Sequence, residues 1–234
     1  MKKFRQLFFL LFFLQVLNVK FAQAQRGKTI PHFTPFWVGV KADVMRLYGR
    51  YSPSLLLRAV LFARPFRPLF TMRLCQAVCL LPEPLRLTFL LPCRGLHYLA
   101  QQLAGMDLGW DTAIGPGMLI NHGWGFVTGR GSDTDEGITF GSNVTVFQGV
   151  TIGVTHRFSE NGRIRLIPKI EDDVWIGPHA VITGEVVIGR GSRIAPGTIV
   201  TGNVEPFSIV GGNPMRVLKT NAEADVLRPA KLAS

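Results

Sequence analysis

Aliphatic residues recur at every sixth position near the C-terminus, and this period constrains the fold more than any other feature of the chain. The series comprises Ile170, Ile176, Ile182, Ile188, Ile194 and Val200. A period of six fits neither an amphipathic helix nor an ordinary strand, whereas fixed six-residue repeats are typical of a parallel β-helix. Two shorter series have the same period of six residues, one at Ile114, Ile120 and Phe126 and the other at Phe140, Val146 and Ile152. We therefore predict a mainly β fold whose stacked coils bury a continuous aliphatic column.

The turns between these short strands are expected at small residues. Glycine tolerates backbone angles that a Cβ forbids, so it is expected to serve these turns. The glycines with this expected role are Gly115, Gly141, Gly153, Gly177, Gly184 and Gly189. Residues 127–139 and 153–169 lack the six-residue beat, and we expect loops there that interrupt the coil and carry functional side chains.

Positive charge is concentrated in the N-terminal half. Residues 1–105 contain 15 Lys and Arg against 2 Asp and Glu, whereas residues 106–234 contain 11 against 13. Arginines alternate with Leu and Phe over 55–64, which favours a bilayer surface or a subunit contact, or helices whose arginines merely extend to water. No nucleic-acid-binding motif accompanies the charge, so no nucleic-acid partner is expected.

The chain divides into four parts on these criteria. Residues 1–25 form a segment that resembles a signal or a membrane anchor, and residues 26–105 form a helical region that prolines divide into several helices. The β-helix is expected over 106–219. A polar C-terminal tail is expected over 220–234.

Four motifs in residues 107–217 carry a resemblance to a known family. They are residues 114–123, which include His122, residues 143–153, residues 168–177 and residues 212–214. In this order they resemble the hexapeptide-repeat acyltransferases, and within them the serine acetyltransferase-like and polysaccharide O-acetyltransferase branch. The resemblance implies a left-handed parallel β-helix preceded by an N-terminal α-helical region. It also implies an acetyl-CoA-dependent O-acetyltransferase that assembles as a homotrimer and needs no metal.

The resemblance assigns the catalytic roles to two residues. His122 matches the general base, whose imidazole would take the proton of a hydroxyl while that oxygen attacks the acetyl thioester directly. A base of this kind needs a partner on its other ring nitrogen, and Asp107 matches the carboxylate that has this role. Asp111 is near in sequence and could substitute for it or contact the acceptor. Either aspartate could instead be a turn residue.

The acceptor is expected from the positions at which this chain departs from serine acetyltransferases. Those enzymes have an aspartate before the base and an Arg-His pair before the Pro-Lys-Ile motif, whereas this chain has Asn121, Leu166 and Ile167. An uncharged pocket does not compensate a buried zwitterion. We therefore expect the hydroxyl of a sugar or of a lipid-linked glycan, with Asn121 as a contact. His156 could supply other polar contacts, so the serine O-acetyltransferase of cysteine biosynthesis is the alternative.

The resemblance places acetyl-CoA in a groove between neighbouring subunits. Six small residues match the positions that line the pantetheine arm, and two basic residues could meet the CoA phosphates. The lining residues are Gly153, Thr155, Gly177, Pro178, Ala195 and Pro196, and the basic residues are Arg216 and Lys219.

Two other classes of function are weighed against this one. A metal enzyme that resembles the β-helical carbonic anhydrases would use His122, His156 and His179, but these lie 34 and 23 positions apart and lack a short ligand pair. A non-catalytic scaffold is the other, because a fold alone does not establish chemistry. We expect acyl transfer rather than either.

The expected location follows from the N-terminus and from the donor. Lys2, Lys3 and Arg5 precede an apolar run over 7–14, and small residues follow at 22–24, which is the order of a secretory signal peptide. Export would conflict with a cytoplasmic acyl donor. An uncleaved anchor, a start codon placed too far upstream and true secretion are the three explanations, and we expect a cytoplasmic protein that touches the inner face of the membrane through this segment.

Overall fold

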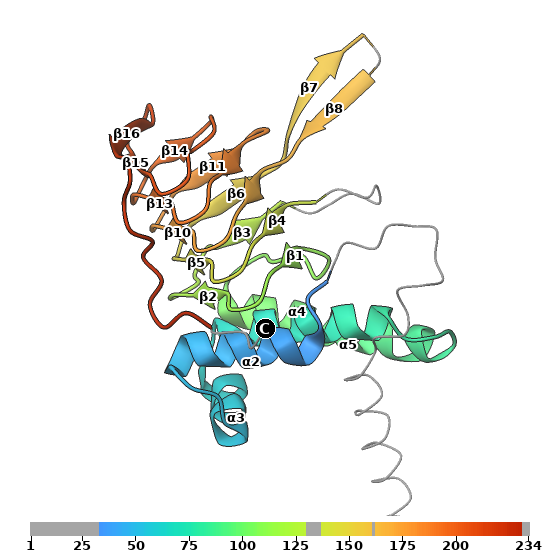
Figure 1. The fold of residues 1–234 in the computed structure, drawn as a ribbon. Helices are drawn as coiled ribbons and strands as arrows, with labels where there is room; N and C mark the ends of the chain where they lie inside the picture. The colour runs from blue at the N-terminus through green and yellow to red at the C-terminus, as the bar shows by residue number, and fades with distance from the viewer. Residues whose placement is uncertain (1–32, 130–136, 161, 231–234) are drawn as a thin grey trace, which may run out of the picture.

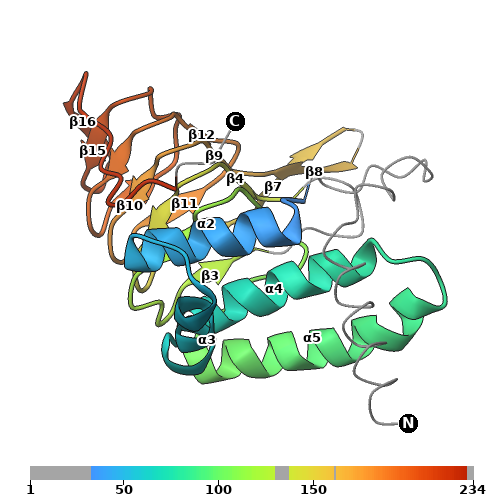
Figure 2. The same cartoon turned by 60° about the horizontal axis from the view of Figure 1, so that its bottom comes forward.

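The computed structural model describes residues 33–129, 137–160 and 162–230, so our predictions for residues 1–25 lie outside it. A layer of helices forms one end of the molecule, and the β-helix stands on this layer (Figures 1 and 2). The helices are α2 (Phe36–Tyr48), α3 (Pro53–Phe62), α4 (Phe66–Cys79) and α5 (Leu85–Ala104). The expected proline boundaries are present in part: Pro53 begins α3 after the Ser52 cap, whereas Pro92 lies inside α5 without ending it.

The β-helix consists of three parallel sheets that form the sides of a prism. The first sheet has the order β1 (Ala113–Ile114), β4 (Thr139–Phe140), β9 (Lys169–Ile170) and β12 (Val187–Ile188). The second has β2 (Leu119–Ile120), β5 (Thr145–Val146), β10 (Trp175–Ile176), β13 (Arg193–Ile194), β15 (Ile209–Gly211) and the antiparallel β16 (Arg216–Lys219). The third has β3 (Val127–Thr128), β6 (Thr151–Gly153), β11 (Val181–Thr183) and β14 (Ile199–Val200). The predicted left-handed parallel β-helix after an N-terminal helical region is confirmed.

The six-residue series supplies the interior of this prism. Ile176 pairs in register with Val146 and Ile194, and Ile182 pairs with Ile152 and Val200, so residues of like shape stack from coil to coil. These side chains have 0% exposure, and each buried aliphatic side chain of this size contributes roughly 1.5–3 kcal/mol relative to an exposed one. The period of six is therefore the spacing of successive sheets around the prism.

One residue of the series does not have the predicted position. Phe126 is buried, but the residue that stacks on Ile152 is Thr128, eight positions after Ile120 rather than six. The corner between the second and third sheets contains two more residues in this first coil than in the next. Asn121 occupies the position of Phe147 and Trp124 that of Gln148, so the two additional residues are His122 and Gly123.

Five of the six glycines directly follow a strand, where the turns were predicted, but the predicted reason, a backbone conformation that a Cβ forbids, holds for only one of the six. Gly184 alone among them has a positive φ, at 93°, while the left-handed positions at other corners belong to residues such as Asn143 and Asp173. The other glycines, with the exception of Gly153, are required for space. A Cβ on Gly115 would lie 2.5 Å from the carbonyl carbon of Gly141, and one on Gly189 would lie 2.5 Å from the nitrogen of Pro206. The coils stack too closely for a side chain there.

The two interruptions have different forms. Residues 153–169 were expected to be a loop, but they contain an antiparallel hairpin of β7 (Thr155–Ser159) and β8 (Gly162–Leu166). The hairpin projects from the side of the β-helix (Figure 1). Within 127–139, residues 127–128 and 139 belong to strands. The chain after β16 returns along the β-helix to the helical layer, where Arg228 Nη1 donates to the carbonyl of Leu47 at 2.9 Å.

A buried ion pair joins the helical layer to the first coil. Arg73 Nε on α4 donates to Asp43 Oδ2 on α2 at 2.7 Å, and both side chains have at most 1% exposure. Asp43 Oδ1 also accepts from the backbone N–H groups of Gly117 and Met118, each at 3.0 Å. Arg73 Nη2 donates to the carbonyl of Gly115 at 2.9 Å. The pair therefore connects two helices to the turn between β1 and β2.

Candidate active site

His122 lies in the two-residue insertion at the corner between the second and third sheets. Its backbone is left-handed, with φ of 63°, and its side chain is exposed. Gly123 and Gly125 are also left-handed, each with φ of 68°, so the corner makes a wider turn than the corners above it. The N–H of Gly125 donates to the carbonyl of Gly105 at 2.7 Å, which attaches this corner to the end of α5. The insertion therefore carries an accessible imidazole on a supported turn.

An arginine of the helical layer holds this corner. Arg64, between α3 and α4, donates from Nη2 to the carbonyl of His122 and from Nη1 to the carbonyl of Ala104 at 3.3 Å. Its guanidinium lies 3.8 Å from the ring centroid of Trp124, a cation–π contact. Burial lowers the pKa of Arg64, and arginine nevertheless stays charged in proteins. The sequence analysis missed this residue, because nothing local distinguishes Arg64 from the other arginines of the region.

The two predicted aspartates lie at different points of the segment that leads from α5 to β1. Asp107 forms a parallel bridge with Val127, the strand residue that follows the His122 corner, and its N–H donates to the carbonyl of Phe126 at 2.9 Å. Asp107 is exposed and lies one coil below Val127, just after the α5 end that supports His122. Asp111 lies further on, in the turn before β1. The topology thus brings Asp107 nearer to the His122 corner than Asp111.

Several of the predicted donor residues share one edge of the prism with His122. Pro178 follows Gly177 at the same corner two coils above, and Gly197 donates to the carbonyl of Pro178 at 2.8 Å, which places the Ala195–Pro196 corner on top of it. Asn121 and these four residues therefore form one column along the edge. Gly211, which pairs with Arg216, stacks on Ala195, so Arg216 lies near the top of this column, while Lys219 pairs with Ile209 at the other end of β15.

Two residues of this edge were not predicted as site residues. The Oε1 atom of Gln148, one coil above Trp124, is buried and has no hydrogen-bond partner among the described residues. His179 is exposed and left-handed, with φ of 59°, and its ring lies against Gly149 of the coil below. Whether an amide oxygen has a hydrogen-bond donor depends on the side chains that surround it in the folded protein. The sequence alone therefore does not identify such a group.

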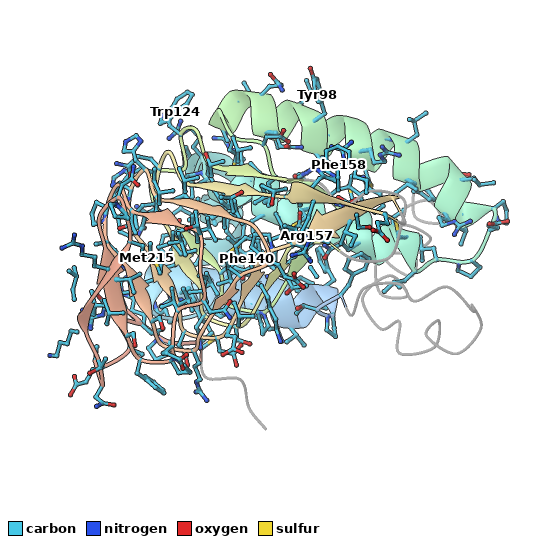
Figure 3. The ribbon with its side chains drawn as sticks, turned by 90° about the horizontal axis from the view of Figure 1, so that it is seen from above. Tyr98, Trp124, Phe140, Arg157, Phe158 and Met215 are labelled. Carbon is cyan, nitrogen blue, oxygen red and sulfur yellow. The ribbon has the colours of Figure 1, made fainter. Side chains whose placement is uncertain are left out.

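Within one chain, the remaining predicted residues lie away from His122. Gly153 ends β6 and Thr155 begins β7, at the far side of the third sheet. His156 is exposed on the hairpin, where desolvation and then the charges of Arg163 and Arg165 lower its pKa. Figure 3 shows Arg157 and Phe158 of the hairpin at a distance from Trp124, which points outward from the edge that carries His122. One copy of the chain therefore does not assemble the complete predicted set.

The residues at the departures from the serine acetyltransferase pattern are uncharged and partly enclosed. Leu166 ends β8 and is half-buried, and Ile167 packs against the core of the β-helix. Asn121 is half-buried beside His122. Within the described ranges, no group of three or more His, Cys, Asp or Glu side chains is arranged to hold a metal ion. None of the described helices is long and apolar enough to cross a membrane.

The chain is similar to known acyltransferases. Residues 167–202 match the model of the bacterial transferase hexapeptide family (six repeats). The chain is 37% identical over 130 residues to a serine acetyltransferase of Bacillus licheniformis, which covers 56% of each chain, and 37% identical over 97 residues to the galactoside O-acetyltransferase of Escherichia coli, which covers 39% of this chain and 48% of that one. It therefore spans about half the length of these relatives.

Similarity extends to solved structures. The crystal structure of Neisseria gonorrhoeae serine acetyltransferase in complex with serine is 28% identical, with a TM-score of 0.60, and the match covers 79% of this chain and 69% of that one. This match includes more of the chain than the sequence matches to curated relatives do. These findings confirm that the chain resembles the hexapeptide-repeat acyltransferases, and within them the serine acetyltransferase-like branch.

Proposed function

We propose that this protein is an acetyl-CoA-dependent O-acetyltransferase. The observation that carries the proposal is the two-residue insertion that presents His122 on the corner of the first coil, braced by Arg64 and above the end of α5. The Nε2 or Nδ1 atom of His122 takes the proton of the acceptor hydroxyl, and the oxygen attacks the thioester carbonyl. The C–O bond forms, the C–S bond breaks, and CoA leaves as a thiolate that accepts a proton. Asp107 orients the imidazole.

The donor is proposed to lie along the edge that carries the column. Gly177, Pro178, Ala195 and Pro196 expose little side-chain bulk there, and Arg216 near its top is a suitable partner for phosphate. Gly153, Thr155 and His156 belong to another edge of the same chain. A homotrimer with parallel β-helix axes would bring the second edge of one copy beside the His122 edge of its neighbour. The proposed site is therefore shared between copies.

L-serine is the acceptor that the comparisons favour. The curated relatives from Bacillus licheniformis and Bacillus subtilis are serine acetyltransferases by name, and the Neisseria structure is a complex with serine. Serine, the alternative in the sequence analysis, therefore replaces the sugar as the preferred acceptor. A neutral hydroxyl acceptor is the second candidate, because Asn121, Leu166 and Ile167 provide no charge for a zwitterion, and because the galactoside O-acetyltransferase also matches.

An acceptor screen distinguishes these candidates. The purified protein is given acetyl-CoA with L-serine or with neutral sugars, and release of the free thiol is followed against a reaction without acceptor. We expect L-serine to raise the rate of thiol release above the acceptor-free rate. A rate increase with sugars alone would replace serine by the second candidate. No increase with any acceptor, although acetyl-CoA binds in calorimetry, would contradict the proposed transfer.

Replacing Arg64 by alanine is expected to lower kcat about tenfold and to leave the KM for acetyl-CoA nearly unchanged. The substitution removes the charged hydrogen bond to the His122 carbonyl and the contact with Trp124, so the corner that carries the base loses its support. Arg64→Lys should recover part of kcat, because an ammonium can still donate to the carbonyl. The control is Arg67→Ala, whose guanidinium donates to the carbonyls of Val60 and Leu61 instead. An equal loss in both alanine variants would mean that Arg64 only stabilises the helical layer.

A further inference from the structure

The outward side of α5 is an apolar surface. Its opposite side packs on α4 through His97, Ala100, Gln101 and Ala104, which are buried. The outward side carries large apolar residues, and Leu91 has 77% of its surface exposed. These exposed residues are Leu87, Leu91, Leu96, Tyr98, Leu99 and Leu103. Figure 3 shows Tyr98 pointing away from the body of the protein.

The helix α3, which packs against α2 and α4, carries a second group of exposed apolar side chains. Leu57, Leu61 and Phe62 are exposed, and Phe62 has the same exposed fraction as Leu91, 77%. Both helices belong to the layer at the end of the molecule opposite β15 and β16 (Figures 1 and 2). We call the exposed residues of these two helices the α3–α5 surface. Exposed apolar residues in this number are typical of an interaction surface rather than of a surface that faces water.

Positive charge predominates in the helical layer. Residues 33–105 contain nine Lys and Arg and only two acidic residues. One of the acids, Asp43, is buried against Arg73, and the other, Glu83, pairs with Arg86. Arg58 and Arg94 are exposed beside the apolar residues and lie near the rings of Tyr48 and Trp110. The surface therefore combines apolar side chains with a rim of arginines.

We propose that the α3–α5 surface binds an anionic phospholipid bilayer. The leucines and Phe62 would enter the boundary between headgroups and acyl chains, while Arg58 and Arg94 would contact the lipid phosphates. The excess of positive charge favours an anionic bilayer over an isologous contact with a second copy, because such a contact would place Arg58 and Arg94 against their own equivalents. The inference does not depend on the acetyl transfer. It differs from the expectation for residues 1–25, because the binding residues belong to folded helices.

Sedimentation of the full chain with vesicles tests this proposal. Vesicles of phosphatidylcholine alone are compared with vesicles that contain about one third phosphatidylglycerol, at low and at high salt. We expect the protein to sediment with the anionic vesicles and to be released by salt, since the arginine contribution is screened. The double substitution Phe62→Glu and Leu91→Glu should lower the partition coefficient at least about tenfold. Phe158→Glu, at an exposed phenylalanine on the hairpin, is the matched control and should bind like the wild type.

Other outcomes would overturn the proposal. Unchanged binding of the double variant would assign the interaction to another segment, such as residues 1–25. A change in molar mass by light scattering, without a change in vesicle binding, would mean that a second copy covers the surface. Circular dichroism checks that the double variant is folded. If it is not, Arg58→Gln with Arg94→Gln is used instead, and binding to anionic vesicles equal to that of the wild type would contradict the proposal.

Discussion

Replacement of His122 by alanine is expected to lower kcat by about two to four orders of magnitude. The substitution removes the imidazole that is proposed to act as the base at the inserted corner, where Asn121, Gly123 and Trp124 cannot act as bases. The hydroxyl would then attack the thioester without general-base assistance. The measurement is thiol release from acetyl-CoA in the presence of the acceptor that the screen identifies.

A second substitution tests whether the loss of kcat comes from the missing imidazole or from a changed backbone conformation at residue 122. His122 has a left-handed conformation, with φ of 63°, and asparagine adopts that conformation more readily than alanine. His122→Asn should therefore retain the corner and still lose kcat to the same extent. Calorimetry should show acetyl-CoA affinity close to that of the wild type in both variants. A His122→Asn protein with wild-type kcat would remove His122 from the mechanism.

Replacement of Asp43 by alanine is expected to lower the free energy of unfolding by about 3–5 kcal/mol. It leaves the Arg73 guanidinium buried without its carboxylate, and it leaves the N–H groups of Gly117 and Met118 without their acceptor. Removing one partner of a buried pair costs more than the pair contributes, because the remaining charge stays in a poorly solvated site. Chemical denaturation followed by circular dichroism measures the change.

The matched control is an ion pair on the β-helix whose arginine is exposed. Arg190 lies 3.1 Å from Asp173, and its side chain is 60% exposed. Arg190→Ala should change the free energy of unfolding by no more than about 1 kcal/mol, because water and salt screen an exposed pair. Changes of similar size in both variants would mean that the Asp43–Arg73 pair does not hold the helical layer to the β-helix.

The regular part of the fold could be predicted from the sequence to within a residue or two. Each strand needs one inward aliphatic residue, so the spacing of Ile176, Ile182 and Ile188 predicts the three strands of one coil directly. The prediction failed at Phe126. This apolar residue lies six positions after Ile120, as predicted, but an insertion of two residues means that Thr128 rather than Phe126 pairs with Ile152. The hairpin of β7 and β8 was also missed, because its residues do not follow the period of six and most of its side chains are exposed.

The candidate site also contains residues that could be predicted from the sequence and residues that could not. His122, Asn121 and the small residues of the proposed donor edge were predicted from motifs that are local in sequence. Arg64 and Gln148 were not, since their importance depends on a carbonyl 58 residues away and on an unpaired amide oxygen. The position of Asp107 relative to Asp111 also required the stacking of Asp107 under Val127.

Local residue patterns were enough to predict that this chain forms a prism of stacked coils with a histidine at one corner, because period and motif are properties of neighbouring residues. How that corner is supported, and how the helices are joined to it, became known only from the folded structure. Asp43 and Arg73 are 30 residues apart, and they meet because α2 and α4 pack against the same turn of the first coil. Contacts of this kind depend on which distant segments of the chain pack together, and a local pattern of residue types does not show this.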